Sequence, residues 1–208
     1  MSESAEYPPE PWYLSGDLHC SAWCVPVGAL PELPSGVRPL TVAGQAFVFA
    51  AWADYRPPGV LSYRELLVAV VVRGGPRVTI PRIWVDSPAS LAGGRALWHI
   101  PKEAAEFRLT DEPEFAAEAR ADGNLLAGTE FRRRRALPFR LPLAFSVLQH
   151  GPRRSRVRVA ARLGVARSVW RVGAGGPAAF LTGRRPVVSL VARDFRMRFG
   201  GRTPVSHP

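Results

Sequence analysis

The chain has 208 residues, of which 47% are hydrophobic and 10% aromatic, and its formal net charge is +11. This length favours a single domain, and the apolar content is sufficient for a packed core. The apolar run over residues 66–72 is far too short to span a bilayer, and residues 1–11 lack the apolar segment of a signal peptide. The sequence therefore predicts a soluble, cytoplasmic protein with no membrane partner.

The charge is unevenly distributed along the chain. Residues 1–131 carry 10 basic and 16 acidic side chains, a net charge of −6, and residues 132–208 carry 18 and 1, a net charge of +17. A basic half can bind nucleic acid or another polyanion. The half has no RNA-binding signature with interleaved aromatic residues, which argues against nucleic acid. Arginines on solvated strand faces or at a subunit interface are the alternative explanation.

Cys20, Cys24 and His19 lie close together in the sequence. They supply no disulfide framework, and no second pair of Cys or His residues completes a zinc site. We therefore expect two buried thiols, no metal and no cofactor.

The first half of the chain predicts four strands, over residues 12–27, 45–54, 63–73 and 77–86, because these segments are rich in β-branched and aromatic residues. Residues 28–38 contain two prolines, with Pro39 directly after them, and predict a short helix or turn followed by a loop. Pro81 predicts an edge or a bulge in the fourth strand.

A helix is predicted after the fourth strand. Ser87 is a suitable N-cap, and Pro88 fits the first helical position. The pair Gly93-Gly94 weakens a helix, which indicates that another group approaches its backbone closely. Pro101 ends the helical pattern, so the sequence places Lys102 on the following loop.

The second half predicts strands over residues 107–109, 125–135, 141–149, 155–163, 165–172 and 187–199, with an acidic turn region over 111–122. Many short strands with Gly/Pro turns and few helices indicate a mainly β (α+β) chain, closed or sandwich-like and antiparallel. We expect a disordered segment over 1–11, one domain over 12–200 and a tail over 201–208.

Lys102 is the only lysine: of the 28 Lys and Arg residues, 27 are arginine. A lysine amine can lose its proton when desolvated and attack a carbonyl, whereas a guanidinium stays charged. The alternative is an ordinary solvated surface lysine.

Three segments carry a family resemblance: Tyr63-Arg64-Glu65, Val85 to Arg95 (VDSPASLAGGR), and Ile100-Pro101-Lys102. They resemble the acetoacetate decarboxylase family, in which a Y-x-E segment precedes a segment that ends in a Schiff-base lysine after proline. The resemblance implies an antiparallel β-barrel or cone around an apolar cavity, often in homo-oligomers. It also implies a carbon–carbon lyase that forms an iminium on Lys102 with a small oxo acid, for decarboxylation or for aldol or dehydration chemistry.

The resemblance assigns roles to further residues. Glu65 matches the pocket glutamate and would move protons or hold the substrate, although a half-exposed glutamate at a strand start is the alternative. Tyr63, Arg95 and Ile100 would form the wall or support of the pocket. Glu103 replaces the second lysine of the family and would favour the ammonium form of Lys102 if it faced the pocket.

Two other family positions differ. No arginine occurs between Met1 and Gly36 to hold a substrate carboxylate, and the second pocket acid of the family falls near Ala50. These differences indicate a divergent member. Two other functions remain open: a non-catalytic β-barrel that binds an apolar carbonyl compound, and a polyanion-binding protein.

Overall fold

The computed structural model describes residues 6–150 and 154–201, and this part of the chain is mainly β, as predicted. The strands are β1 (Trp12–Pro26), β2 (Thr41–Val42), β3 (Gln45–Tyr55), β4 (Tyr63–Val71), β5 (Arg77–Val85), β6 (Lys102–Ala104), β7 (Glu106–Thr110), β8 (Phe115–Ala121), β9 (Asn124–Ala136), β10 (Leu141–Leu148), β11 (Arg154–Val172) and β12 (Val188–Phe199). The helices are α1 (Pro88–Trp98) and the 3-10 turns η1 (Val27–Ala29) and η2 (Ala179–Leu181). The outer parts of both predicted terminal segments, residues 1–5 and 202–208, lie outside the described residues.

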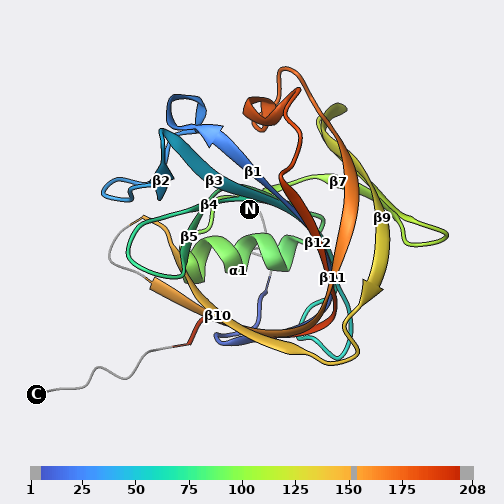
Figure 1. Cartoon of the computed structure of the whole chain (residues 1–208). Helices are drawn as coiled ribbons and strands as arrows, with labels where there is room; N and C mark the ends of the chain where they lie inside the picture. The colour runs from blue at the N-terminus through green and yellow to red at the C-terminus, as the bar shows by residue number, and fades with distance from the viewer. Residues whose placement is uncertain (1–5, 151–153, 202–208) are drawn as a thin grey trace, which may run out of the picture.

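Seven strands close the sheet into a ring, in the order β10-β5-β4-β3-β1-β12-β11, because β10 also pairs with β11 (Figure 1). Strands β9, β8 and β7 extend the sheet from β11, and β6 adds to β5. Most pairs are antiparallel, as predicted. β5 is the exception, because it pairs in parallel with both β6 and β10.

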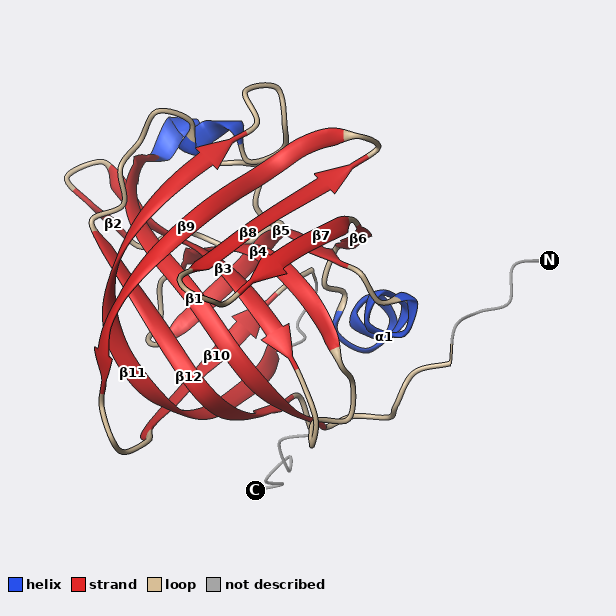
Figure 2. Cartoon of the chain, turned by 90° about the vertical axis from the view of Figure 1, so that its right-hand side faces the viewer, coloured by secondary structure: helices blue, strands red, loops and turns tan. Residues whose placement is uncertain are grey.

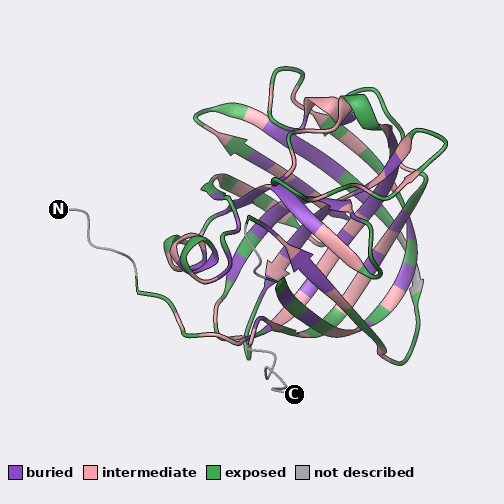
Figure 3. Ribbon diagram, turned by 90° about the vertical axis from the view of Figure 1, so that its left-hand side faces the viewer, coloured by how far each residue is buried: buried purple, intermediate pink, exposed green. Residues whose placement is uncertain are grey.

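The inside of the ring is filled by an apolar core. Side chains alternate between the two faces of each strand, and buried and exposed segments accordingly alternate along the strands (Figure 3). Inward-facing residues from every strand of the ring meet in this core, among them Leu14, Tyr55, Ile83, Val157 and Phe195. Full burial of one such large apolar side chain contributes about 1.5–3 kcal/mol.

A second core lies on the outer side of β3, β4 and β5. Trp52, Leu66 and Trp84 point out of the ring there and pack against the extension formed by β7, β8 and β9, through Phe115 and Phe131. In strand β6, which pairs with β5, Lys102 is buried, whereas Glu103 and Ala104 are exposed.

The predicted helix is confirmed as α1, which lies at one end of the ring (Figure 2). The Ser87 Oγ atom accepts a hydrogen bond from the Ser90 N–H at 3.2 Å, and Pro88 occupies the first turn. Two indole N–H groups connect this end of the molecule to residues before β1: Trp98 donates to Glu10 Oε2 at 2.9 Å, and Trp12 donates to the Pro8 carbonyl at 2.7 Å. In the described part of the chain, no helix combines the length and the hydropathy needed to cross a bilayer.

Two predicted segments of the second half differ from the structure. The acidic region 111–122, predicted as a turn, contains β8. Residues 155–163 and 165–172, predicted as two strands, form the single strand β11. Pro81 causes a bulge, as predicted, since the pairing of β4 with β5 shifts between Val68 and Val70, although β5 is not an edge strand.

The two cysteines of β1 differ in exposure, so the prediction of two buried thiols holds only in part. Cys20 is partly buried and Cys24 is exposed, and both are free. Burial raises the pKa of the Cys20 thiol to about 12, which keeps it protonated near neutral pH. The thiolate is the reactive form, so Cys20 should be inert in the folded protein.

We therefore expect iodoacetamide at pH 8 to alkylate Cys24 and to leave Cys20 unmodified until the chain is denatured. Peptide mass spectrometry measures both sites in one sample. The Cys24→Ser variant is the control and should show almost no native labelling. Equal labelling rates at the two cysteines would contradict the protected state of Cys20.

Candidate active site

Lys102 is the first residue of β6 and not a loop residue, which corrects the sequence prediction. Its backbone lies beside Ile83 of β5 in the parallel pairing. Because neighbouring residues of a strand face opposite sides, Lys102 points toward the inside of the ring and Glu103 points away from it. The side chain of Lys102 is only 4% exposed.

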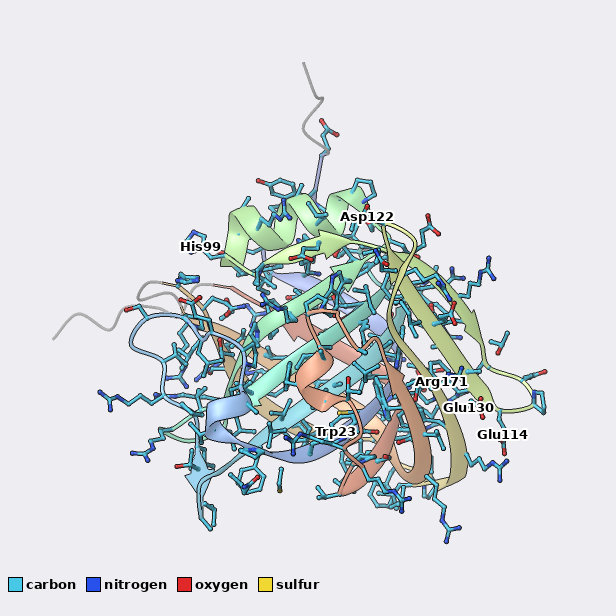
Figure 4. The ribbon with its side chains drawn as sticks, turned by 90° about the horizontal axis from the view of Figure 1, so that it is seen from above. Trp23, His99, Glu114, Asp122, Glu130 and Arg171 are labelled. Atoms are coloured by element: carbon cyan, nitrogen blue, oxygen red, sulfur yellow. The ribbon has the colours of Figure 1, made fainter. Side chains whose placement is uncertain are left out.

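The end of α1 directs the chain into β6. His99 lies at the end of α1 (Figure 4). It adopts the left-handed conformation with φ of 55°, and its N–H donates to the carbonyls of Gly94 and Arg95. The Ile100 N–H also donates to the Gly94 carbonyl, at 3.1 Å. These bonds satisfy the last helical carbonyls and reverse the chain, so that Lys102 comes back beside the helix that precedes it.

The Lys102 ammonium has three oxygen neighbours. The Nζ atom donates to Glu65 Oε2 and to Ser90 Oγ, both at 2.8 Å, and to the Tyr63 hydroxyl at 3.4 Å. It also lies 5.0 Å from the centre of the Tyr63 ring. These partners come from β4 and α1, so the site is assembled from segments that are separate in the sequence.

Glu65 faces the inside of the ring from β4, and its side chain is 4% exposed. The Tyr55 hydroxyl donates to Oε1 at 3.0 Å, and the Tyr63 hydroxyl donates to Oε2 at 3.4 Å. Burial, reinforced by the negative charge of Glu65, raises the pKa of both phenols well above the usual value. Both hydroxyls therefore stay protonated and remain donors to the carboxylate.

Gly94 provides the space for the lysine side chain. A Cβ atom at this position would lie 2.7 Å from Lys102 Cδ and 2.8 Å from Cε, closer than carbon atoms pack. The neighbouring Gly93 is equally constrained, because its Cβ would lie 2.5 Å from the Trp12 ring. Both glycines of the predicted pair thus permit close approach, one to the lysine and the other to the core.

The remaining predicted site residues take different positions. Arg95 Nε donates to the main-chain carbonyl of Lys102 at 2.7 Å, which holds the start of β6 against α1. Ile100 is buried, and its carbonyl accepts from the Lys102 N–H at 2.8 Å. Glu103 lies on the other face of β6, where its Oε2 atom accepts from the Trp84 indole at 3.0 Å.

Sequence reasoning missed Ser90 and Tyr55. Ser90 lies four residues before Gly94, so the two share a helix face, and this spacing could have placed Ser90 beside the lysine. Tyr55 lies directly across from Tyr63 in the pairing of β3 with β4, and their rings stack at 4.3 Å. Only a register assignment for two distant strands could have revealed it.

Two further features are separate from this site. A pocket of about 650 Å³ lies where β1, β10, β11 and β12 meet, and its lining includes Arg158, Arg196 and Arg198 but neither Lys102 nor Glu65. Among residues 6–150 and 154–201, no group of three or more His, Cys, Asp or Glu side chains is arranged to hold a metal ion.

The sequence matches the family model of acetoacetate decarboxylase over residues 33–147, more than half of the chain. The chain belongs to the acetoacetate decarboxylase family. The match includes all six residues that the sequence analysis assigned to the site, from Tyr63 to Glu103. No curated protein sequence matches this member of the family significantly.

Solved structures agree with the family assignment at the level of the fold. Acetoacetate decarboxylase from Legionella pneumophila subsp. pneumophila str. Philadelphia 1 superimposes with a TM-score of 0.72 and 15% identity, over 94% of this chain and 87% of its own. The enduracididine biosynthesis enzyme MppR, complexed with pyruvate, gives 0.66 and 19%, over 96% and 91%. An acetoacetate decarboxylase-like enzyme from Sphingomonas wittichii RW1 gives 0.64 and 14%, over 98% and 96%.

Proposed function

We propose that this family member is a Schiff-base lyase in which Lys102 forms an iminium with the carbonyl carbon of a small oxo compound. The observation that carries the proposal is the contact of 2.8 Å between Lys102 Nζ and Glu65 Oε2, with both side chains buried. It joins an amine to a group that can take its proton, in surroundings where an isolated charge is unfavourable.

Glu65 is the proton acceptor in this proposal. Transfer of one proton from Nζ to Oε2 converts the charged pair into a neutral amine and a neutral acid, and no net charge enters or leaves the site. Ser90 Oγ, 2.8 Å from Nζ, and the Tyr63 hydroxyl hold the amine in place during this transfer. The neutral amine carries the lone pair that attacks a carbonyl.

The covalent step then follows from the same groups. The Nζ atom bonds to the carbonyl carbon, and the carbonyl oxygen leaves as water with one proton from the amine and one from Glu65. A positively charged iminium then remains on Lys102, beside the carboxylate of Glu65. The iminium attracts electrons from the neighbouring bond. An oxo acid with a β-carboxylate would lose carbon dioxide there, and other substrates would undergo aldol or dehydration chemistry. The relatives support this range, since one is an acetoacetate decarboxylase and another binds pyruvate.

Reductive trapping tests this proposal. We expect borohydride to fix an adduct on the peptide that contains residue 102 when the protein is incubated with a panel of small ketones, aldehydes and oxo acids. Lys102 is the only lysine, so the N-terminal amine is the single competing primary amine, and mass spectrometry separates the two. The Lys102→Arg variant keeps the charge and should give no adduct at position 102.

A panel in which no carbonyl compound yields a mass increase at Lys102 would refute the Schiff-base mechanism.

One observation favours a second candidate function, a protein that binds a carbonyl compound without catalysis. The three hydrogen bonds of Nζ are also those expected if Lys102 is a structural cation. In that case the protein would bind a carbonyl ligand without turnover, and ligand-induced thermal stabilisation without trapping would identify it.

A further inference from the structure

In the part of the chain that the structure describes, no arginine is buried. Among the described residues, the buried Asp, Glu, Lys and Arg side chains are Asp17, Glu65 and Lys102. Asp17 belongs to another cluster, in which it accepts bonds from Arg56 and from the Asp194 N–H. Lys102 is therefore the single buried cation of the described chain, and Glu65 already neutralises it.

Arg64 and Arg95, which adjoin the residues of the site, make their contacts elsewhere. Arg64 precedes Glu65 on β4 but points to the opposite face, where it lies 3.8 Å from Asp86. Arg95 is exposed and donates through Nε to the main-chain carbonyl of Lys102. The other polar neighbours of the amine and of Glu65 are the hydroxyls of Ser90, Tyr55 and Tyr63, and burial keeps both phenols neutral.

Because the charges of Lys102 and Glu65 cancel, their buried site favours an uncharged substrate over a charged one. An oxo acid brings a carboxylate, and after the iminium has formed, Lys102 and Glu65 still cancel each other. The carboxylate of the substrate would thus remain as an uncompensated buried charge, which is strongly unfavourable. An uncharged aldehyde or ketone adds no charge at any step.

We propose that the substrate of this site is an uncharged aldehyde or ketone and not an oxo acid. This inference rests on the proposed Schiff-base function and restricts its substrate class. The covalent step is unchanged: the Nζ–C bond forms, the C–O bond breaks, and water leaves. The bond broken next to the iminium is then a C–H, C–C or C–O bond, without loss of carbon dioxide.

A matched pair of carbonyl compounds tests the inference. Pyruvate and pyruvamide have almost the same size and the same ketone, but only pyruvate is charged. We measure the initial rate of cyanoborohydride trapping at Lys102 in the wild-type protein for both, and divide each rate by that of the free amine of Nα-acetyl-lysine. We expect the normalised rate to be about 100-fold higher for pyruvamide. Burying the carboxylate of pyruvate without a compensating cation costs free energy, and this cost lowers the trapping rate of pyruvate by about that factor.

The Glu65→Gln variant removes the negative charge of the site and keeps an oxygen that accepts hydrogen bonds from the two tyrosines. Its site carries one net positive charge once the iminium has formed, so the preference for pyruvamide should fall at least about tenfold. The wild-type comparison is sufficient by itself if this variant does not fold.

The outcomes separate this inference from the function on which it rests. Trapping of pyruvate at a normalised rate equal to or above that of pyruvamide overturns the uncharged-substrate inference and leaves the Schiff base intact. Absence of any Lys102 adduct with both compounds and with the wider carbonyl panel overturns the Schiff-base function itself.

Discussion

Replacing Glu65 by glutamine is expected to lower the free energy of unfolding by about 3–5 kcal/mol, since removal of one partner leaves the other charge buried without compensation. The Lys102→Met variant should have a similar cost, because the carboxylate of Glu65 then loses its cation. Urea denaturation followed by circular dichroism measures both values.

The double variant Glu65→Gln/Lys102→Met should recover most of that loss, since a buried ion pair is often no more stabilising than a neutral pair of similar volume. The four proteins form a double-mutant cycle that isolates the interaction energy. Single-variant costs below about 1 kcal/mol that simply add in the double variant would show that the pair is not a buried ionic contact.

An exposed ion pair is the matched control. Glu130 and Arg171 lie 3.4 Å apart at the surface, with side chains that are 55% and 61% exposed (Figure 4). Glu130→Gln removes the same charge by the same chemical change. We expect a loss below about 1 kcal/mol there, because water and salt screen exposed pairs.

Replacing Gly94 by alanine is expected to reduce the rate of reductive trapping at Lys102 by about 100-fold, since a misplacement of the reacting group by about 1 Å has this effect on a positioned reaction. The added methyl group would displace Lys102 Cδ and Cε, and with them the amine. The trapping assay with a readily trapped carbonyl measures the rate.

The free energy of unfolding should change little in Gly94→Ala. Alanine favours the helix by about 0.5–1 kcal/mol relative to glycine, and this gain offsets part of the steric cost. Gly28→Ala is the control, since a Cβ at Gly28 has no neighbour within 4 Å, and it should trap at the wild-type rate. A Gly94→Ala protein with unchanged trapping would show that the glycine does not position the amine.

Local patterns were sufficient to predict most of the fold. The apolar and β-branched runs of β3, β4 and β5 predicted these strands to within two residues of their observed ends, and Ser87 with Pro88 located the start of α1. The patterns failed where side chains are small or charged. In β8, Ala117 and Ala119 face the second core and alternate with Ala116, Glu118 and Arg120. The buried residues are small, so the apolar signal in the sequence is weak.

Gly164 misled the prediction in another way. It separates the two strands predicted over 155–163 and 165–172, but it lies within β11, where a Cβ would approach Ala136 Cα of β9 to 3.1 Å. Its small size serves a close contact between strands. A sequence shows that a position is small, but it does not show which neighbour requires it.

The candidate site was predictable in its residues but not in its contacts. The position of the lone lysine and the Y-x-E segment identified Lys102 and Glu65. The environment of the amine depends on the parallel pairing of β6 with β5 and on the return of the chain after His99, which are non-local features. For this reason the sequence placed Lys102 on a loop and left the direction of Glu103 open.

The ring is closed on one side by a very short junction. Strand β10 meets β5 at only two residue pairs, Ser146 with Arg77 and Val147 with Val78, and β6 occupies the other end of the same edge of β5 through Ile83 to Val85. Few main-chain hydrogen bonds must break for the ring to open there, so local unfolding costs less at this junction than along the long pairings of β11 with β12. The buried amine is carried by a three-residue strand on that same edge. Opening of this junction would therefore free the edge of β5 along which the lysine-bearing strand is paired.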